Sequence, residues 1–461
     1  MTVVDRHVEA PPTLPAPQPP ERPLPFRRLL EVLRDNQIAA YGAESYSADI
    51  IEWRRLWRHS MLLNEPGAIK HVLLDNAQNY HKTEITRRQL EPAVGRGLLT
   101  SEGETWRRHR RIMSPAIDHR SIVSYAPVMT EVAQRLLQRW EALPDGEIDV
   151  APAMMQATLN IISLTMFSRD SEDIVAFIEH GFERFQTQMR LGLIDFLELP
   201  AWLKKFTFAP RAEAIFAELD QVIAQLLASR AAAPVDGQSK DLLARLIAAR
   251  DEETGRGMTA EEMRNQIITI FLAGHETTSL ALTWAWYLLS QHPATEARLH
   301  AELDHVLGGC TPQHEDLAKL PFTRMVIEES MRLYPPAHAL GRTAIHADEV
   351  RGRRVRPGTS IIISPWLLHR NPKLWERPER FEPERFAAEH AAARHRFANI
   401  PFGAGPRICI GAAFAMAEGM LILAAIAQRY RLRLKPGFAV EPQALITLRP
   451  RHGMRMILER R

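Results

Sequence analysis

Near its C-terminus the chain contains the stretch Pro401-Phe402-Gly403-Ala404-Gly405-Pro406-Arg407-Ile408-Cys409-Ile410-Gly411. Cys409 is one of only two cysteines in the 461 residues, and an apolar stretch that we expect to be helical, Gly411–Ala427, follows it. The amides and the positive dipole end of a helix N-terminus stabilise a thiolate and lower the pKa of the thiol. Because the thiolate is the form of cysteine that binds metals, this position predicts a metal-ligating sulfur.

The residues around Cys409 indicate what kind of metal group it would bind. Gly403 and Gly405 permit positive φ values, which let backbone N–H groups turn toward the sulfur. Gly411 lacks a Cβ where a flat ligand would lie against the helix, and Arg407 supplies a positive charge for an anionic cofactor. Together these features predict a site for haem bound through a single thiolate. An ordinary loop cysteine among turn glycines is the alternative interpretation.

A second motif lies inside the apolar stretch Ile267–Ser290, at Ala273-Gly274-His275-Glu276-Thr277-Thr278. A glycine in a helix interior costs about 1 kcal/mol relative to alanine, and an unpaired buried carboxylate costs more. Hydroxyl side chains and glycine bend a helix and admit water. The motif therefore predicts a distorted turn whose acid and hydroxyl, Glu276 and Thr277, relay protons. A solvated notch or a helix-packing glycine is the alternative. A zinc-protease motif is excluded, because Ser279 lies where the second histidine would be needed.

The string Phe402-x-x-Gly405-x-Arg407-x-Cys409-x-Gly411, continued by Phe414-Ala415-x-x-Glu418, resembles the haem-binding signature of the cytochrome P450 family. The resemblance covers the chain from about residue 25 to its end. It implies a mainly α fold with small β-sheets, shaped as an α-rich triangular prism with a long central helix over the haem. It also implies that Glu276 is the acid and Thr277 the hydroxyl of the proton relay, while Ala273 and Gly274 leave room for oxygen.

Further motifs match the same family. Glu329 and Arg332 resemble its Glu-x-x-Arg helix, and Arg385 its Pro-x-Arg-Phe partner, which implies a buried network that supports the cysteine loop. Trp106 and Arg110, four residues apart, fall on one helix face and resemble the family's propionate-binding Trp-x-x-x-Arg pair. The complete predicted haem-contact set is Trp106, Arg110, Ala273, Gly274, Arg342, Phe402, Gly403, Arg407, Cys409 and Gly411, with Cys409 as the iron ligand.

Length and composition are consistent with a large globular core. The chain has 46% hydrophobic residues and a net charge of +3, which gives no case for nucleic-acid binding. Eight prolines between positions 11 and 25 predict an extended, disordered arm over residues 1–25, and we expect residues 26–461 to form one domain. The chain has only two cysteines, so we expect no framework of disulfide bonds. Cys310 lies in a Gly-Gly-Cys-Thr-Pro turn. We expect a cytoplasmic protein with no membrane anchor.

Periodicity locates several elements. Helical patterns cover Pro66–Asn76 and Ala260–Ser290. The three histidines His275, His338 and His369 are interpreted as packing or pocket residues rather than metal ligands. We expect strands around Ala48–Arg58 and at Ser60–Leu63, Leu340–Ala344, Arg353–Val355, Ser360–Ile363, Tyr430–Leu434 and Arg455–Leu458.

The resemblance implies a haem-thiolate monooxygenase that inserts one oxygen atom of O2 into an apolar substrate. Arg88 and Arg96 are possible carboxylate partners, so a fatty acid is favoured over a terpenoid or steroid. A peroxide-driven peroxygenase, a haem isomerase or dehydratase and a non-enzymatic haem sensor are alternatives. The segments expected to line the substrate pocket are 88–99, Gln186–Leu199, Ala273, Thr277, Ala337–Leu340 and Ala444–Thr447.

Two electrons per turnover would come from a separate ferredoxin- or flavodoxin-type donor and its reductase. A basic patch expected near the thiolate side could receive an acidic electron carrier. Its predicted members are Arg107, Arg108, Arg111, Lys373, Arg394, His395 and Arg396.

Overall fold

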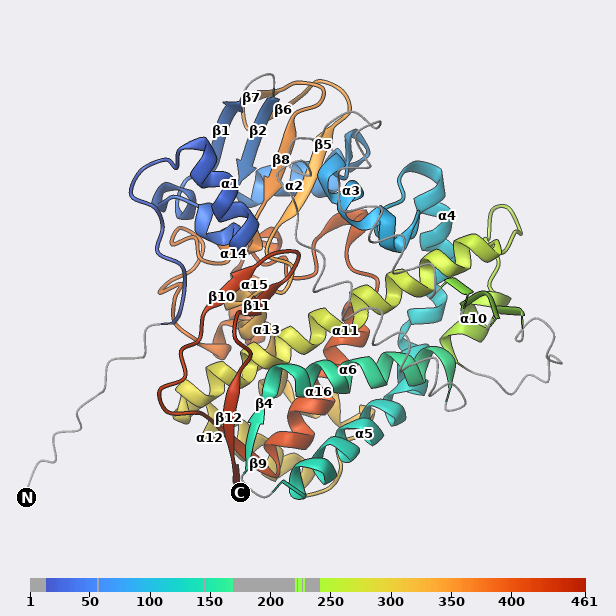
Figure 1. Ribbon diagram of the computed structural model, residues 1–461, viewed down its shortest axis with the longest axis vertical. Coiled ribbons are helices and arrows are strands. Elements are labelled where there is room, and N and C mark those ends of the chain that lie inside the picture. The colour runs from blue at the N-terminus through green and yellow to red at the C-terminus, as the bar shows by residue number, and fades with distance from the viewer. Residues whose placement is uncertain are drawn as a thin grey trace, which may run out of the picture.

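The computed structural model of the chain describes residues 14–55, 58–143, 146–168 and 241–461, together with 220, 221, 223–225, 227 and 228. Figure 1 shows a helical body with a sheet at its upper edge. The longer helices are α4 (Gly103–Met113), α5 (His119–Glu141), α6 (Val150–Phe167), α11 (Ala260–Gln291), α12 (Pro293–Leu307), α13 (Pro321–Leu333) and α16 (Ala412–Ala427). The others are α1 (Phe26–Asp35), α2 (Pro66–Lys70), α3 (Glu84–Val94), α10 (Leu242–Ala248), α14 (Pro365–Leu368) and α15 (Ala388–Ala393).

Helix α11 crosses the centre of the molecule and organises the helical body around it (Figure 1). A capping box closes its N-terminus, because Thr259 accepts the N–H of Glu262 and Glu262 accepts the N–H of Thr259. Apolar residues occur on all faces of the helix, so it is buried along most of its length against α6, α13 and α16. The helix predicted over Ala260–Ser290 is confirmed.

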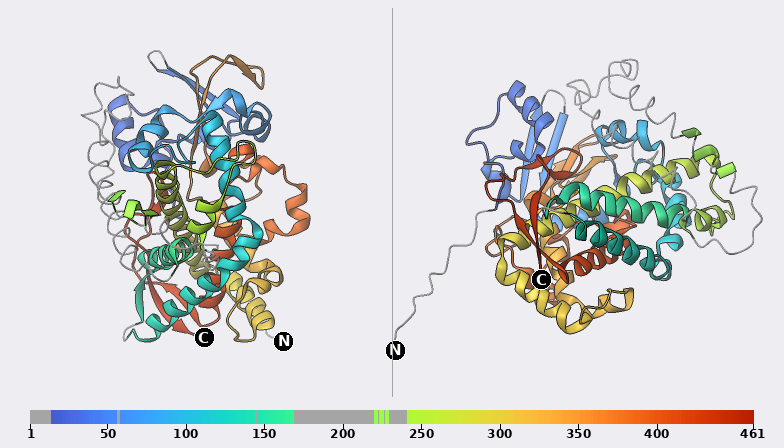
Figure 2. Two further views of the ribbon diagram at one scale, coloured as in Figure 1. Left: turned by 90° about the vertical axis from the view of Figure 1, so that its right-hand side faces the viewer. Right: turned by 60° about the horizontal axis from the view of Figure 1, so that its bottom comes forward.

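Helix α6 runs beside α11 (Figure 2), and Phe167 stacks on Phe271 with ring centroids 5.3 Å apart. Within the described residues, α6 is the one helix that is long and apolar enough to cross a membrane, with a mean hydropathy of 1.3. Most of this helix is buried inside the protein, as the core helix of a globular fold would be.

The sheets lie at the edges of the helical body. The largest has the order β1 (Ile50–Arg55), β2 (Arg58–Leu63), β8 (Ser360–Ile363), β5 (Leu340–Ala344), β3 (Tyr80–His81). Only its β2–β8 pair is parallel. A second sheet has the order β4 (Glu147–Asp149), β12 (Arg455–Arg460), β9 (Tyr430–Leu434). Two antiparallel pairs complete the set: β6 (Asp348–Val350) with β7 (Arg353–Val355), and β10 (Pro442–Ala444) with β11 (Leu448–Pro450).

Four of the predicted strands are confirmed at their exact bounds as β5, β7, β8 and β9, whereas the other three are present as β1, β2 and β12 with different bounds. The helix expected over Pro66–Asn76 is divided, because α2 ends at Lys70 and His71–Asp75 form a wider π-helical turn. Short π segments are frequent at functional sites. Here the turn packs against the short helical turn Gly405–Arg407 of the cysteine loop.

Contacts with the rest of the chain begin before residue 26, within the stretch that the sequence predicts to be a disordered arm. Leu14 is buried in the main hydrophobic core. The carbonyl of Pro15 accepts a 3.0 Å hydrogen bond from the hydroxyl of Tyr334, which stacks on Trp284. Residues 14–25 therefore correct the expected boundary, while residues 1–13 lie outside the described part of the chain.

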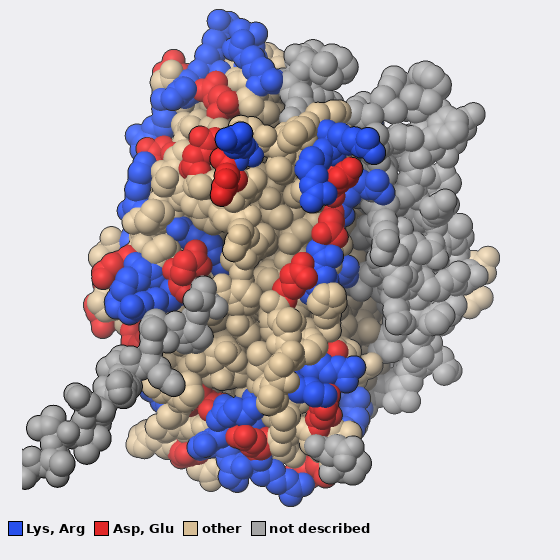
Figure 3. Space-filling model, turned by 60° about the vertical axis from the view of Figure 1, so that its left-hand side comes forward, with Lys and Arg blue, Asp and Glu red and all other residues tan. Residues whose placement is uncertain are grey.

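Charged residues do not separate by sign on the face drawn in Figure 3. Lys and Arg side chains there lie next to Asp and Glu side chains, with a broad uncharged band between the groups. On this face the intermingling agrees with the small net charge of the chain.

Candidate active site

The cysteine loop is a compact turn that precedes α16. The N–H of Cys409 donates to the carbonyl of Phe402 (2.9 Å), and Arg110 of α4 donates to the carbonyl of Ile408 (2.8 Å). Gly403 and Gly405 have φ values of 71° and 70°, as the sequence predicts. At Gly405 an added Cβ would collide with the carbonyl oxygen of Leu73 in the π-turn, so only glycine fits there.

The sulfur of Cys409 is solvent-accessible in this structure, although protein atoms surround it closely. Burial raises the pKa of the Cys409 thiol, and the N–H of Gly411 and the guanidinium of Arg110 only partly oppose that effect. The sequence-based expectation of a lowered thiol pKa is therefore wrong for the protein by itself, because desolvation outweighs the helix terminus. A metal cation at the sulfur would favour the thiolate directly.

An added Cβ at Gly411 would stand 4.0 Å from the Cys409 sulfur. The glycine thus keeps the space beside the sulfur open, in agreement with the flat ligand that the sequence predicts.

Three cations gather near the loop, and one of them was not predicted. Arg407 lies over the Trp106 ring with its guanidinium carbon 4.2 Å from the centroid, donates to the carbonyl of Ser101 and pairs with Glu102. Burial and Arg407 lower the pKa of Arg342 to about 10. Burial, Arg407 and Arg342 lower the pKa of Lys82 to about 7.

This cluster, defined here as Lys82, Arg342 and Arg407, fits an anionic ligand. In the described ranges of the chain, Glu102 is the one carboxylate that pairs with this cluster. The repulsion among the three cations therefore exceeds their attraction to that carboxylate. A group with two carboxylates, such as haem with its propionates, would compensate this charge. From the sequence, Lys82 carries no signal, because a single lysine before a helix is usually a solvated residue.

The structure separates Trp106 and Arg110, which the sequence predicts to act together. Trp106 stacks on Arg407 within the cation cluster, whereas Arg110 donates to the backbone of the cysteine loop. Their four-residue spacing does place them on one helical face. Arg110 thus holds the loop that carries Cys409 rather than joining the cation cluster.

Two residues at the centre of α11 are accessible, whereas most of the helix is buried. Ala273 is exposed and Thr277 half-buried, although both lie in the middle of the long central helix. The Thr277 hydroxyl donates to the carbonyl of Ala273 (2.9 Å), and that of Thr278 to the carbonyl of Gly274 (3.3 Å). Ala273 and Thr277 are therefore accessible at the middle of the helix, and their predicted place on the oxygen side stays a prediction.

Gly274 lies opposite helix α6. An added Cβ at Gly274 would stand 3.4 Å from the side chain of Ile162, which is an ordinary van der Waals distance. The expectation that Gly274 leaves room for oxygen stays a prediction.

Glu276 is buried, and its Oε1 accepts a 2.7 Å hydrogen bond from the hydroxyl of Thr447, in the turn between β10 and β11. A second carboxyl, Glu418 on α16, is fully buried, and burial raises its pKa well above the usual range despite the nearby Thr278 hydroxyl. No hydrogen-bond partner of either Glu418 oxygen is found among the described residues. Burial therefore favours the neutral form of Glu418, which lies on α16 near Thr278 of α11.

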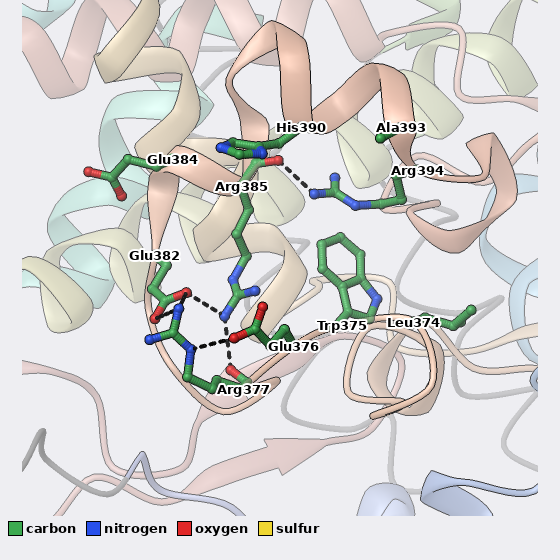
Figure 4. Close-up of a pocket in the computed structure, with 10 residues that line it drawn as sticks. All are labelled: Leu374, Trp375, Glu376, Arg377, Glu382, Glu384, Arg385, His390, Ala393 and Arg394. Carbon is green, nitrogen blue, oxygen red and sulfur yellow. Dashed lines mark hydrogen bonds and ion pairs between the residues drawn. The ribbon is translucent and has the colours of Figure 1, made fainter.

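The predicted Glu329–Arg332–Arg385 network is present. Arg332 is completely buried and donates to both carboxylate oxygens of Glu329 (2.6 and 2.8 Å), while Arg385 lies 3.4 Å from Glu329. Arg332 also donates to three backbone carbonyls, those of His369, Pro378 and Arg380. Figure 4 shows Arg385 reaching Glu382 and the Arg377 carbonyl at the edge of this network.

The predicted histidines are packing residues, as expected. His338 donates from Nε2 to the carbonyl of Leu445 (2.9 Å), and Nε2 of His369 accepts the N–H of Ile400 (3.0 Å). His275 is buried, with Nδ1 bonded to the carbonyl of Phe271.

The predicted basic patch is largely neutralised. Each of four members pairs with a nearby carboxylate: Arg107 with Glu104, Arg108 with Glu262, Arg111 with Asp251 and Lys373 with Asp49. Arg394 lies over the Trp375 ring at 4.1 Å.

Arg88 and Arg96 are the arginines that the sequence predicts to bind a substrate carboxylate. In the structure Arg88 is ion-paired with Glu84 on α3, and Arg96 is exposed. The predicted pocket segment Gln186–Leu199 lies outside the described residues.

A family model described as Cytochrome P450 matches residues 17–453. The chain belongs to the cytochrome P450 family, and its fold and monooxygenase class are those of that family. The family's cofactor is haem bound through a cysteine thiolate, and its monooxygenases use O2 and electrons from redox partners.

Individual relatives cover almost the same range. The chain is 37% identical over 403 residues to cyclooctatin synthase of Streptomyces melanosporofaciens, covering 87% of this chain and 86% of that enzyme. It is 32% identical over 400 residues to pentalenene oxygenase of Streptomyces avermitilis, covering 86% and 87%. The solved haem domain of cytochrome P450DA matches with a TM-score of 0.80 and 25% identity over 97% of this chain and 98% of that domain.

Proposed function

We propose that this monooxygenase hydroxylates a cyclic terpenoid. The observation that carries the proposal is the likeness to two bacterial enzymes named for cyclooctatin and pentalenene. This replaces the fatty acid that the sequence favoured, because the relatives support the terpenoid alternative better.

The paired state of Arg88 agrees with a neutral substrate. A fatty acid carboxylate would need a cation that is not already committed to a protein carboxylate. Arg88 is held by Glu84 at 2.9 Å, and Arg96 is exposed to solvent rather than turned into the protein. Within the described part of the segment 88–99, these are the arginines that could have filled that role. A hydrocarbon-like substrate has no such requirement.

In this proposal Cys409 would bind the haem iron, and Arg342, Arg407 and Lys82 would hold the two propionates, with Trp106 flanking Arg407. The open surroundings of the sulfur and the uncompensated charge of the cation cluster support this assignment. When bound, the haem supplies oxygen activation, and its thiolate ligand favours cleavage of the O–O bond.

Glu276 and Thr277 control protons on the opposite side of the site. The Thr277 hydroxyl donates to Ala273, so its oxygen is available to accept a hydrogen bond from water in the interior space. Glu276 uses Oε1 to accept from Thr447, which leaves Oε2 to exchange a proton with that water. The pair thereby delivers protons one at a time while α11 and α6 exclude bulk solvent.

Thr277→Ala tests the relay, with Thr277→Ser as the matched control that keeps the hydroxyl. Electron consumption should continue in Thr277→Ala, with peroxide release rising and product per electron falling about tenfold or more. Thr277→Ser should retain most of the coupling. Unchanged product per electron in Thr277→Ala would reject the relay and favour a peroxide-driven reaction.

Electrons are delivered in the cytoplasm by a separate ferredoxin- or flavodoxin-type protein. The docking surface in this proposal surrounds the exposed Ile408 next to Cys409, together with the cations of α4. Because several of these cations pair with protein carboxylates, we expect a weak and salt-sensitive complex.

The substrate class is tested by adding cyclic diterpenes, sesquiterpenes and fatty acids of graded length to the ferric protein. Displacement of the distal water by a bound substrate changes the haem absorption spectrum. We expect the cyclic terpenoids to produce this change at micromolar concentrations and to be hydroxylated in a reconstituted assay. A response to fatty acids alone would overturn the proposal.

A further inference from the structure

The contact between Glu276 and Thr447 joins two segments that lie 171 residues apart in the sequence. Both side chains are buried, and their 2.7 Å hydrogen bond has the hydroxyl as donor when the carboxylate is ionised. Across the described ranges, Thr447 is the one side chain that donates a hydrogen bond to the Glu276 carboxylate, and Glu276 has no ion-pair partner there. A buried carboxylate without such a donor would be costly.

The turn that carries Thr447 is itself fixed. Leu448, next to Thr447, donates its N–H to the carbonyl of Pro336 (3.0 Å) and accepts from the indole of Trp284 on α11 (3.1 Å). On the other side of the turn, the carbonyl of Leu445 accepts from His338 (2.9 Å). The hydroxyl of Thr447 therefore occupies a set position relative to α11.

The hairpin base is also attached to the N-terminal part of the chain. Asn36 donates to the carbonyl of Pro442 (2.8 Å) and accepts the N–H of Ala444 (2.9 Å). Ala444 and Leu448 are completely buried. A turn supported at both ends is a suitable anchor for a catalytic side chain, since positioning depends on the rigidity of the supporting groups.

We propose that Thr447 is a positioning residue for the reaction: its hydroxyl fixes the Glu276 carboxylate so that only Oε2 is available for proton exchange. This inference rests on the proposed role of Glu276 in the proton relay. It adds that the β10–β11 turn, which is expected to touch the substrate, also sets the geometry of proton delivery. Coupling of electrons to product then depends on a residue outside α11.

Thr447→Val removes the hydroxyl while keeping the shape of the side chain, and Thr447→Ser keeps the hydroxyl. Thr130→Val is a matched control, because Thr130 is equally buried and donates one hydrogen bond to a distant carbonyl, that of Pro312. For Thr447→Val we expect kcat to fall about tenfold, with more peroxide per electron. KM and the spectroscopic Kd for substrate should stay within about twofold of the wild type, and Thr447→Ser should resemble the wild type.

A double-mutant cycle separates positioning from a purely structural role. Glu276→Gln retains an acceptor oxygen for Thr447 but no exchangeable carboxyl proton. If Thr447 acts through Glu276, adding Thr447→Val to Glu276→Gln should lower kcat by less than about twofold. The thermal unfolding midpoint, read by circular dichroism, should fall similarly in Thr447→Val and Thr130→Val, because each loses one buried hydrogen bond.

Two results would overturn the proposal. One is a Thr447→Val protein that is less stable, like Thr130→Val, but has an unchanged kcat and unchanged coupling. The other is a full tenfold loss of kcat when Thr447→Val is added to Glu276→Gln. The kcat and the product per electron of each variant are compared on whichever apolar compound the enzyme turns over. Failure of the terpenoid assignment therefore changes the compound and leaves this test intact.

Discussion

Two clusters of cationic side chains are compensated to very different degrees. In the first, Arg332 is completely buried, donates five hydrogen bonds to protein oxygens and shares the Glu329 carboxylate with Arg385. In the second, Lys82, Arg342 and Arg407 have one paired carboxylate between them in the described part of the chain, that of Glu102. Burial first, and repulsion within the cluster second, lower the pKa values of Lys82 and Arg342.

The difference separates a structural network from a binding site. A buried charge that finds all its partners within the protein gains nothing from a ligand, and its loss affects folding. A group of cations that repel one another gains from an anionic ligand, and its loss affects binding of that ligand. Both clusters contain arginines from motifs of the same family, so the motif alone does not tell them apart.

The largest effect is expected from Arg332→Met in the compensated cluster. Removing Arg332 takes away both of its hydrogen bonds to the buried Glu329 carboxylate and leaves only the 3.4 Å contact with Arg385 to compensate that charge, at a cost of about 3–5 kcal/mol. We expect little folded protein and a large drop in the thermal unfolding midpoint. Arg135→Met is the control: Arg135 pairs with Glu131 at 2.8 Å on the exposed side of α5, where such pairs contribute about 0–1 kcal/mol. Equal stability of the two variants would contradict the comparison.

Arg342→Met should leave the fold intact and weaken haem binding. Loss of one charge-assisted hydrogen bond of about 1.5–3 kcal/mol corresponds to roughly 10- to 100-fold faster transfer of haem to excess apomyoglobin. Arg353→Met is the matched control, because Arg353 lies in β7 and pairs with Glu52 at the surface. If haem transfer were as slow in Arg342→Met as in Arg353→Met, the cation cluster would not hold the propionates.

His369 allows the compensated cluster to be tested through pH. Burial and the neighbouring Arg332 and Arg370 lower the pKa of His369 to about 3, so the folded protein keeps this imidazole neutral. The unfolded chain takes up the proton below pH 6.5, and this part of the stability is lost as the pH falls from 6.5 toward 3.

His369→Gln removes that dependence. The gap in free energy of unfolding between the wild type and His369→Gln should narrow by about 2 kcal/mol between pH 7 and pH 5. Chemical denaturation at each pH measures the gap. A constant gap would mean that His369 has the same pKa in the folded and the unfolded state.

The smallest effect is expected for cations outside both clusters. Arg96→Gln should change the Kd of a cyclic terpenoid by less than about twofold, because the side chain is exposed and the ligand is neutral. Spectroscopic titration measures this Kd. A loss of binding confined to fatty acids would show that Arg96 recognises a carboxylate.

The features that could be predicted from the sequence are those that depend on residues close together in the chain. The positive φ values of Gly403 and Gly405 follow from their turn, and the strand bounds of β5, β7, β8 and β9 follow from short apolar runs between turn residues. The buried Glu329–Arg332 pair was predicted through its family motif, since three-residue spacing alone is common on helix surfaces.

Features set by distant contacts were not predicted. The cation cluster brings Lys82 beside residues more than 200 positions away, and Thr447 reaches Glu276 across 171 positions. Gly274 faces Ile162 of another helix, and this contact could not be read from α11 alone. The pKa of the Cys409 thiol depends on how many protein atoms surround it, and the helix terminus by itself suggested the opposite direction.

The proposed function depends above all on Cys409 binding haem through its thiolate. The most direct test is the ferric visible absorption spectrum and haem content of the wild type, Cys409→Ala and Cys310→Ala, all expressed with sufficient haem. Cys310 is the control because it is the other cysteine and is exposed. We predict one haem per chain with a thiolate-ligated spectrum in the wild type and in Cys310→Ala, and loss of that spectrum in Cys409→Ala. An unchanged spectrum in Cys409→Ala, or a wild-type protein without haem, would contradict the account.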